Sequence, residues 1–191
     1  MEEGFEDDLE LITDGTEEKE RKKKVDGKGK GDRGELMLGK FLGKHFGHEF
    51  SRGVGSGNRW SHVKEMPQHA KDTFLGDICT PDGFAWVIEC KNGYDDDIDL
   101  NNAFHPIAEL DKWITKALRD SELSGRKPII CWKRKWKPWI AILRQIDYDD
   151  WSDNVLIDFD YYMSYRDWMI VELQVLLDKT PEGYWYRDGK S

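Results

Sequence analysis

Helical spacing of apolar residues first occurs over positions 32–46. Glu35, Leu38 and Leu42 stand at i, i+3 and i+7, so a carboxylate begins the stripe that carries the two leucines. Asp32 is a suitable residue to cap the start of this helix. The spacing predicts a helix over 32–46 that buries the leucines and directs Glu35 toward the same neighbours.

Short runs that favour strands follow this helix. Residues 48–54 predict a first strand, and a polar, glycine-rich loop extends over 55–72. Two further apolar runs, 73–80 and 84–91, are separated by Pro81-Asp82-Gly83, which is typical of a tight turn. We therefore expect a β-hairpin whose two strands lie side by side.

Five further elements are expected in the second half of the chain. Four aliphatic residues that recur at helical intervals predict an amphipathic helix of about 18 residues. They are Ile107, Leu110, Ile114 and Leu118. The remaining predicted elements are strands over 127–132 and 137–143, a strand near 155–159 and a helix near 164–178. The expected order of elements is α-β-β-β-α-β-β-(β)-α, without an internal repeat.

The negative charge of the chain is concentrated at its N-terminus. The formal net charge is −9, and residues 1–20 hold ten carboxylates against one lysine, while the rest of the chain holds 28 acidic and 28 basic residues. A basic, glycine-rich stretch then extends to residue 30, and segments of this kind bury too little apolar surface to become ordered. We expect a disordered arm over 1–30 and a single domain over 31–191 that is able to bind a polyanion.

The composition also bears on location. No run approaches the roughly 20 consecutive apolar residues that cross a bilayer, and the acidic start is unlike a signal peptide. The three cysteines form no CxxC pair and lie in apolar runs, which favours buried structural thiols. We expect a soluble cytoplasmic protein without a membrane partner.

The strongest chemical signal is an aspartate followed by a Glu-x-Lys segment. Side chains alternate along a strand, so Glu89 and Lys91 project together while Cys90 faces the other way. The expected hairpin brings Asp77 beside them, and the preceding helix directs Glu35 toward the same end of the sheet. Hard divalent cations prefer carboxylate oxygens, and a neighbouring lysine can orient or deprotonate water. This set predicts a Mg²⁺-dependent phosphodiesterase site in which Mn²⁺ can substitute.

A Glu-x-Lys segment alone is a weak motif. It occurs twice more in the charged arm, at Glu17/Lys19 and Glu20/Lys22, where nothing would organise a metal. The third copy is distinguished because it ends an apolar strand and accompanies both an aspartate and a helical glutamate. An exposed ion pair at a sheet edge is the alternative interpretation.

The spacing of Asp77 and Glu89-Cys90-Lys91 resembles the signature of the PD-(D/E)xK nuclease superfamily, with Gly76 in place of the usual proline. Two further stretches make the chain similar to the archaeal Holliday junction resolvases over about residues 28–145. They are Lys30-Gly31-Asp32-Arg33-Gly34-Glu35 and Arg52-Gly53-Val54-Gly55-Ser56-Gly57.

The resemblance implies a restriction-endonuclease-like α/β fold with a mixed central β-sheet flanked by helices. The nuclease core would extend over 31–145, with a C-terminal extension over 146–191. The catalytic residues that it implies are Glu35, Asp77, Glu89 and Lys91. The three acids would bind the metal, while Arg52 and Ser56 would contact the DNA backbone near the scissile phosphate. A homodimer that cuts two opposing strands is implied as well.

A second candidate for DNA contact is the segment 132–139, in which four basic residues are interspersed with three tryptophans. Indoles stack on unpaired bases while lysine and arginine contact phosphates. A tight turn with tryptophans packed beneath it accounts for the same pattern, and the sequence leaves both interpretations open. The basic residues that we expect to contact DNA are Lys28, Lys30, Lys133, Arg134 and Lys135.

Together these features predict a metal-dependent DNA endonuclease that hydrolyses phosphodiester bonds and is selective for branched DNA such as a Holliday junction. A sequence- or lesion-directed restriction or repair endonuclease of the same fold is one alternative, because the 55–72 loop offers room for such recognition. A non-catalytic DNA-binding protein with a nuclease fold is another, although suitable residues fill all four catalytic positions.

Overall fold

The structure is a computed structural model that describes residues 27–53, 67, 70, 74–94, 97–100, 104–152 and 159–187, without the side chains of residues 27, 28 and 150–152. Ser56, most of the expected arm and most of the strand expected over 155–159 lie outside these residues. Helix α1 (Gly27–Phe46) buries the two predicted leucines. It begins before Asp32, so the end of the segment assigned to the arm is helical.

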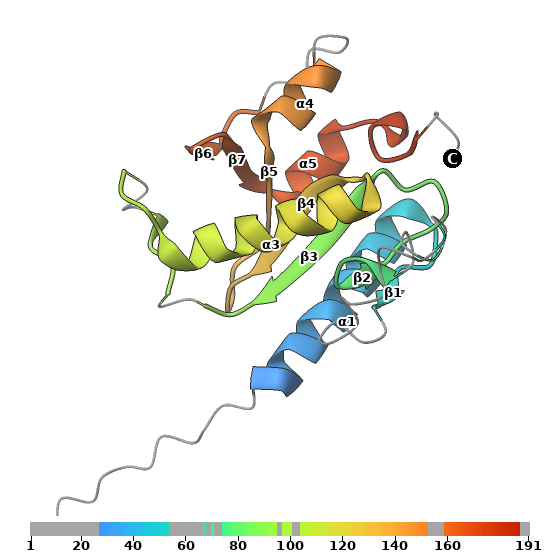
Figure 1. Ribbon diagram of the computed structural model, residues 1–191, viewed down its shortest axis with the longest axis horizontal. Helices are drawn as coiled ribbons and strands as arrows, with labels where there is room; N and C mark the ends of the chain where they lie inside the picture. Colours follow the sequence, from blue (N-terminus) through green and yellow to red (C-terminus); the bar gives the residue numbers. More distant parts are fainter. Residues whose placement is uncertain are drawn as a thin grey trace, which may run out of the picture.

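A five-stranded mixed β-sheet lies at the centre of the molecule (Figure 1). Its strands, in spatial order, are β3 (Trp86–Asn92), β4 (Lys127–Lys133), β5 (Trp139–Arg144), β7 (Trp168–Glu172) and β6 (Met163–Tyr165). β3 and β4 run parallel and are connected through helix α3 (Ala108–Ser124), whereas the other neighbours in this sheet are antiparallel. β3 therefore forms one edge of the sheet, and the predicted mixed α/β architecture is confirmed.

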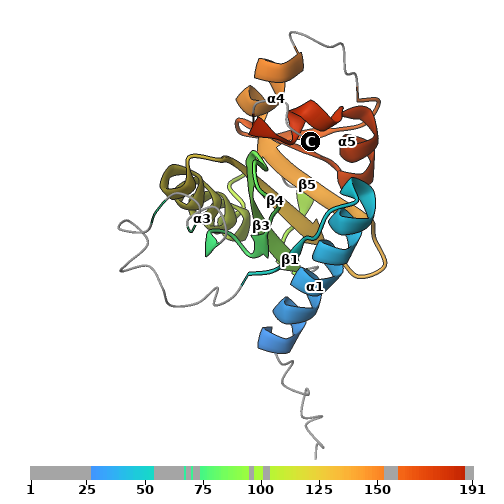
Figure 2. The ribbon, with the colours of Figure 1, turned by 90° about the vertical axis from the view of Figure 1, so that its right-hand side faces the viewer.

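Helices cover both faces of the sheet (Figure 2). On one face lie α1 and α5 (Leu173–Lys179), and Leu38 of α1 belongs to the same buried cluster as Ile88 of β3. On the opposite face lies α3, where Trp113 packs edge-on against Trp132 of β4 with 5.6 Å between ring centroids. Because successive strand residues face opposite ways, each central strand contributes to both clusters.

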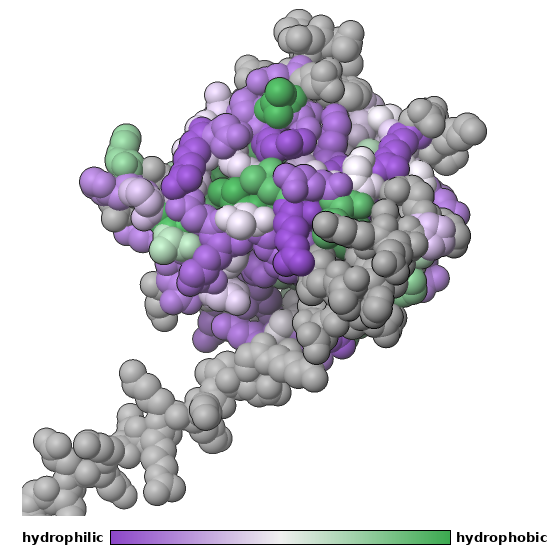
Figure 3. All heavy atoms as spheres, in the orientation of Figure 1, coloured by the Kyte–Doolittle hydropathy of each residue, from purple (hydrophilic) through white to green (hydrophobic). Residues whose placement is uncertain are grey.

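The predicted amphipathic helix is confirmed as α3. Its buried stripe includes Leu110, Ile114 and Ala117, and Gly125 ends it in the left-handed conformation with φ 65°. Figure 3 shows that hydrophilic residues dominate the face of the molecule on which α3 lies. Across the described ranges, no helix combines the length and the apolar character needed to cross a membrane.

The predicted hairpin between 73–80 and 84–91 is wrong in its pairing. β2 (Ile78–Cys79) pairs with β1 (Ser51–Arg52) in a separate two-stranded sheet and not with β3. The turn between the two runs exists, but the ladder that should follow it does not form. Each paired segment is only two residues long, and β1 contains no apolar residue, so the hydrophobic pattern could not indicate this pairing.

C-terminal residues occupy the position that the hairpin would have filled. Ala85 N–H donates to the Trp185 carbonyl oxygen at 2.7 Å, and Phe84 forms an isolated antiparallel bridge with Tyr186. These residues follow η3 (Glu182–Tyr184), a short 3-10 helix that was not predicted. A partner about 100 residues away along the chain leaves no local signal in the sequence.

The helix predicted over 164–178 is wrong in its first part. Residues 163–172 form the β6–β7 hairpin, which turns at Arg166 with φ 54°, and only α5 is helical. Met169 belongs to the cluster on the α1 face, and Ile170 to the cluster on the α3 face. A strand that is covered on both faces is apolar at every position, so periodicity cannot distinguish it from a buried helix.

Another short helix was also missed. α4 (Gln145–Ser152) follows β5 directly, and its apolar residues show no helical stripe. The Arg144 guanidinium binds Asp147 in the first turn of α4, with Nε 2.6 Å from Oδ2. A polar interaction of this kind was not visible in the hydrophobic pattern.

Because β7 is buried on both faces, truncating a side chain on either face should lower the stability of the fold. Met169→Ala and Ile170→Ala should each lower the free energy of unfolding by about 2–5 kcal/mol, because each truncation leaves a cavity in a different cluster. Urea denaturation measures the loss in each variant. Gln174→Ala on the exposed side of α5 should stay within about 0.5 kcal/mol of the parent. Loss in only one of the two buried variants would contradict the strand assignment.

Candidate active site

β3 ends with the Glu-x-Lys segment, and its side chains alternate as predicted. Cys90 belongs to the buried cluster on the α1 face, while Glu89 and Lys91 project to the α3 face. Glu89 is 2% exposed, and the Lys91 ammonium forms an ion pair with its Oε1. A carboxylate buried this deeply needs a charged partner, because an unpaired buried charge costs several kcal/mol.

Asp77 reaches β3 from beyond the edge of the sheet. Its N–H donates to the Ile88 carbonyl oxygen at 2.8 Å, and its Oδ2 accepts a hydrogen bond from the Cys90 N–H at 2.8 Å. Gly76 permits this approach, since its φ is 87° and a Cβ there would lie 2.8 Å from the Ile88 oxygen. Proline cannot adopt that φ, so the glycine in place of the signature proline has a structural reason.

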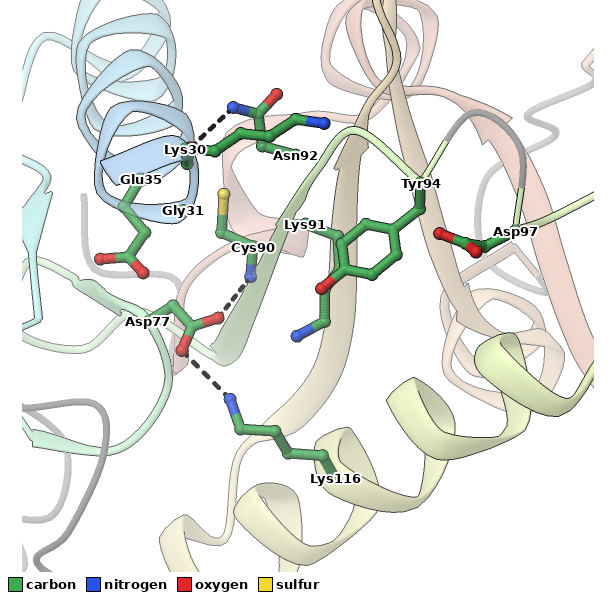
Figure 4. Close-up of a pocket in the computed structure, with 10 residues that line it drawn as sticks. All are labelled: Lys30, Gly31, Glu35, Asp77, Cys90, Lys91, Asn92, Tyr94, Asp97 and Lys116. Carbon is green, nitrogen blue, oxygen red and sulfur yellow. Dashed lines mark hydrogen bonds and ion pairs between the residues drawn. The ribbon is translucent and has the colours of Figure 1, made fainter. Parts of the chain in front are cut away.

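Lys116 of α3 completes the site and was not predicted. Its Nζ lies 3.1 Å from Asp77 Oδ1 (Figure 4) and also forms an ion pair with Glu89 Oε2. Two carboxylate oxygens therefore converge on one cationic position. A usable signal was present in the sequence, because Trp113, Lys116 and Asp120 stand at i, i+3 and i+7. That spacing places the lysine at the border of the buried stripe of α3, where its side chain is half-buried.

Glu35 approaches the site from α1. It is 8% exposed, and Arg52 Nε donates to its Oε2 at 2.7 Å. The same guanidinium forms an ion pair with Asp32 through Nη2. Arg52, predicted as a DNA contact, therefore neutralises two acids of α1 in this structure.

The structure brings the predicted acids to one edge of the sheet from different directions. Glu89 is on the α3 face of β3, Glu35 comes from the helix on the opposite face, and Asp77 lies at the edge beside both. Within the described ranges, no three His, Cys, Asp or Glu side chains are arranged to hold one ion. Asp77 and Glu89 thus share a cationic position directly, whereas Glu35 is held by Arg52.

A cavity of about 530 Å³ opens at this edge of the sheet (Figure 4). Glu35 and Asp77 both line it, as do Lys91 and Lys116, the two lysines that form ion pairs with the buried Glu89. The charged residues that line the cavity are Lys30, Glu35, Asp77, Lys91, Asp97 and Lys116. A wall that mixes carboxylates with ammonium groups suits a phosphate group bound together with a cation.

Burial shifts the ionisation of the acids in this cluster. Burial and the charge of Asp77 raise the pKa of Glu89 to about 7, although both neighbouring lysines oppose the shift. Burial also raises the pKa of Glu35, against the effect of its guanidinium partner. Burial alone would lower the pKa of Lys116, but the surrounding carboxylates raise it above its usual value. The carboxylates therefore stabilise any cation that lies between them.

The donor set fits a hard divalent cation. Asp77 and Glu89 offer carboxylate oxygens, which are the ligands preferred by Mg²⁺ and Mn²⁺. Their oxygens already point at a common position, which the Lys116 ammonium marks. Both acids are buried, so bulk water screens their charges little.

The basic residues predicted to contact DNA lie in two regions. Lys30 lines the cavity, and its carbonyl oxygen accepts a hydrogen bond from Asn92 Nδ2 at 2.8 Å. The end of β4 and the turn after it form the second region, which begins beside Asn92 in the β3–β4 register. It contains Lys133, Arg134 and Lys135. The Lys28 side chain, like Ser56, lies outside the described part of the chain.

The mixed sheet, with an aspartate beside the Glu-x-Lys strand, defines the PD-(D/E)xK nuclease fold class. The family model of the phage putative PDDEXK endonucleases matches residues 26–185, and the chain belongs to this family. The matched region includes all of the described helices and strands, β7 and α5 among them. No curated protein and no solved structure matches the chain.

Asp120 adds a further buried carboxylate one turn after Lys116. It is 3% exposed, and its Oδ1 has no hydrogen-bond partner among the described residues. Burial raises the pKa of Asp120 to about 6, although the neighbouring lysine opposes the shift. Its carboxyl group therefore favours the protonated form in the folded state more than in the unfolded state.

This shift predicts a pH dependence of stability. The stability that protonated Asp120 contributes is fully present below the pKa of this group in the unfolded state, near pH 4. It is lost as the pH rises through about 6. Asp120→Asn abolishes this titration. The free energy of unfolding of the variant, taken relative to that of the parent, should therefore rise by roughly 2–3 kcal/mol from pH 4 to pH 7. Urea denaturation at both pH values measures the difference, and parallel pH profiles would contradict the assignment.

Proposed function

We propose that this protein is a divalent-metal-dependent DNA endonuclease that hydrolyses phosphodiester bonds in the cavity beside β3. The observation that carries the proposal is the convergence of Asp77 Oδ1 and Glu89 Oε2 on one cationic position next to Lys91. Membership of a PD-(D/E)xK endonuclease family supports hydrolysis of nucleic acid. The buried acids and the cavity supply the environment that this chemistry needs.

Asp77 and Glu89 are the residues that would hold the metal, with Glu35 as the third acid at the same cavity. We propose Mg²⁺ as the ion, with Mn²⁺ as a substitute, because the donors are carboxylate oxygens. When bound, such an ion polarises the scissile phosphate and lowers the pKa of a water ligand. Lys116 occupies the shared position in this structure, so its ammonium group must leave before an ion can bind there.

Lys91 acts as the catalytic lysine in this proposal. Its Nζ is held by Glu89 and lines the cavity, where it can orient the attacking water and offset charge on the phosphate. Lys30 is placed at the same cavity to bind a neighbouring phosphate of the substrate. Arg52 can also contact the backbone of the DNA, because its guanidinium group binds Glu35, which lines the cavity.

Within this function, we propose branched DNA, such as a four-way junction, as the substrate. A homodimer would cut two opposing strands of this DNA, and the reaction would take place in the cytoplasm. The support is the likeness of the catalytic segments to archaeal Holliday junction resolvases. A sequence- or lesion-directed endonuclease of the same fold is the alternative. Cleavage of a synthetic junction against a linear duplex of matched sequence separates the two, since only the first predicts a preference for the junction.

Substitutions at the site should slow DNA cleavage while the protein still folds. Lys91→Ala and Asp77→Asn should each lower the rate of DNA cleavage with Mg²⁺ by about 10²–10⁴-fold. The first removes the ammonium group that orients the water, and the second removes a charged ligand of the metal. Single-turnover cleavage measures the rate, and urea denaturation checks that the variants fold. Lys112→Ala, on the exposed side of α3, is the matched control. Parental rates in either site variant would refute the proposed site.

Removal of the Lys116 ammonium should strengthen metal binding. Lys116→Met deletes the positive charge that occupies the shared position, so Mn²⁺ should bind about tenfold or more tightly in the absence of DNA. Isothermal titration calorimetry measures this affinity without reference to activity. Lys112→Met should leave it unchanged, and equal or weaker binding by the Lys116 variant would argue against a shared position.

A further inference from the structure

The three tryptophans of the basic segment have different environments. Trp132 is 0% exposed, and its Nε1 donates to the Gly93 carbonyl oxygen at 2.7 Å. Trp139 is 6% exposed and belongs to the cluster on the α1 face. Trp136 is 90% exposed. Two of the indoles therefore pack into the two cores, and the third is on the surface.

Trp136 occupies a position that costs folding free energy in two ways. Its φ is 60°, a left-handed conformation that glycine or asparagine adopts more readily, at the third residue of the turn closed by Lys137 N–H and the Arg134 carbonyl oxygen at 3.3 Å. Its indole is also left in water, where a large apolar ring is unfavourable. The only ring contact found for it within the described residues is with the Lys135 ammonium, 5.9 Å from the centroid. Stability of the fold does not account for a tryptophan here.

The turn that carries Trp136 begins beside the cavity. Lys133 pairs with Asn92 in the β3–β4 register, and the Gly93 N–H donates to the Lys133 carbonyl oxygen at 2.8 Å. Asn92 lines the cavity that holds Lys91. Three residues span at most about 10 Å, so the indole is within a few nucleotides of the candidate site.

The charge around Trp136 indicates what the ring would bind. Four basic residues lie between Lys133 and Lys137, and no aspartate or glutamate occurs between residues 123 and 146. Lys135 and Lys137, which flank Trp136 in the sequence, are both exposed. An exposed aromatic face within a uniformly basic turn fits a polyanion that offers aromatic faces of its own, which is a nucleic acid strand with unpaired bases.

We propose that Trp136 stacks on an unpaired nucleobase of the DNA substrate and so selects DNA whose bases are unpaired or splayed next to the cutting site. This inference rests on the proposed DNA endonuclease function and specifies its substrate class. Paired bases within a duplex present their edges and not their faces, so a fully matched duplex gains nothing from the ring. Trp136 is then a specificity-determining residue, while the lysines and arginine of the turn bind phosphates in either substrate.

The test compares Trp136→Gly with Trp136→Phe in the full-length chain. Glycine is suited to φ 60°, so the first variant should be at least as stable as the parent in urea denaturation. Fluorescence anisotropy in EDTA measures binding to a duplex that contains one unpaired adenine and to a matched duplex of the same length. The glycine variant should bind the first DNA about 10–100-fold more weakly and the second less than about twofold more weakly, while phenylalanine restores most of the difference.

Every other outcome overturns the inference. Equal losses on both DNAs would make Trp136 a general contact, and no loss on either would leave it without a role in DNA binding. Binding of vesicles containing phosphatidylglycerol that depends on Trp136, without an effect on DNA, would assign the turn to a membrane surface. Because binding is measured without metal, a parent that selects the unpaired base through Trp136 but never cuts DNA would retain this inference and lose the proposed activity.

Discussion

Two acidic side chains, Asp77 and Glu89, are buried around a single cationic position at the edge of the sheet. Like charges repel strongly where water is excluded, so this pair requires a cation between its oxygens. Lys116 meets that requirement in the structure, and Lys91 forms a second ion pair with Glu89. Because the four residues come from β3, α3 and the segment beside the edge, the same ion pairs hold those elements together.

The edge position of β3 explains how one site receives groups from both layers of the fold. Helices cover its two faces, and an edge strand has one side open to a further segment, which here carries Asp77. Glu35 and Arg52 can therefore approach from the α1 side while Lys116 approaches from the other. The open side of the strand is also where the cavity forms, and Glu35 and Asp77 both line it.

The parts of the site that follow a local period could be predicted, and those that depend on distant partners could not. Glu35 begins a helical stripe and Glu89 alternates with Cys90, so both orientations could be predicted from short-range geometry. The position of Asp77 beside β3 was predicted, but through a hairpin that does not form, and the actual cause is the left-handed Gly76.

Lys116 was missed because a lysine on a helix is usually exposed. Its spacing from Trp113 was the available clue. The β6–β7 hairpin was missed because burial on both faces removes the period on which prediction depends.

The central claim is that the oxygens of Asp77 and Glu89 share one divalent cation, and a crystal structure of the protein soaked with Mn²⁺ tests it most directly. Anomalous scattering at the manganese absorption edge locates the ion independently of any bound DNA. The account predicts a peak between Asp77 Oδ1 and Glu89 Oε2, with the Lys116 ammonium displaced from that position. A peak elsewhere, with Lys116 still bridging the two acids at saturating Mn²⁺, would contradict it.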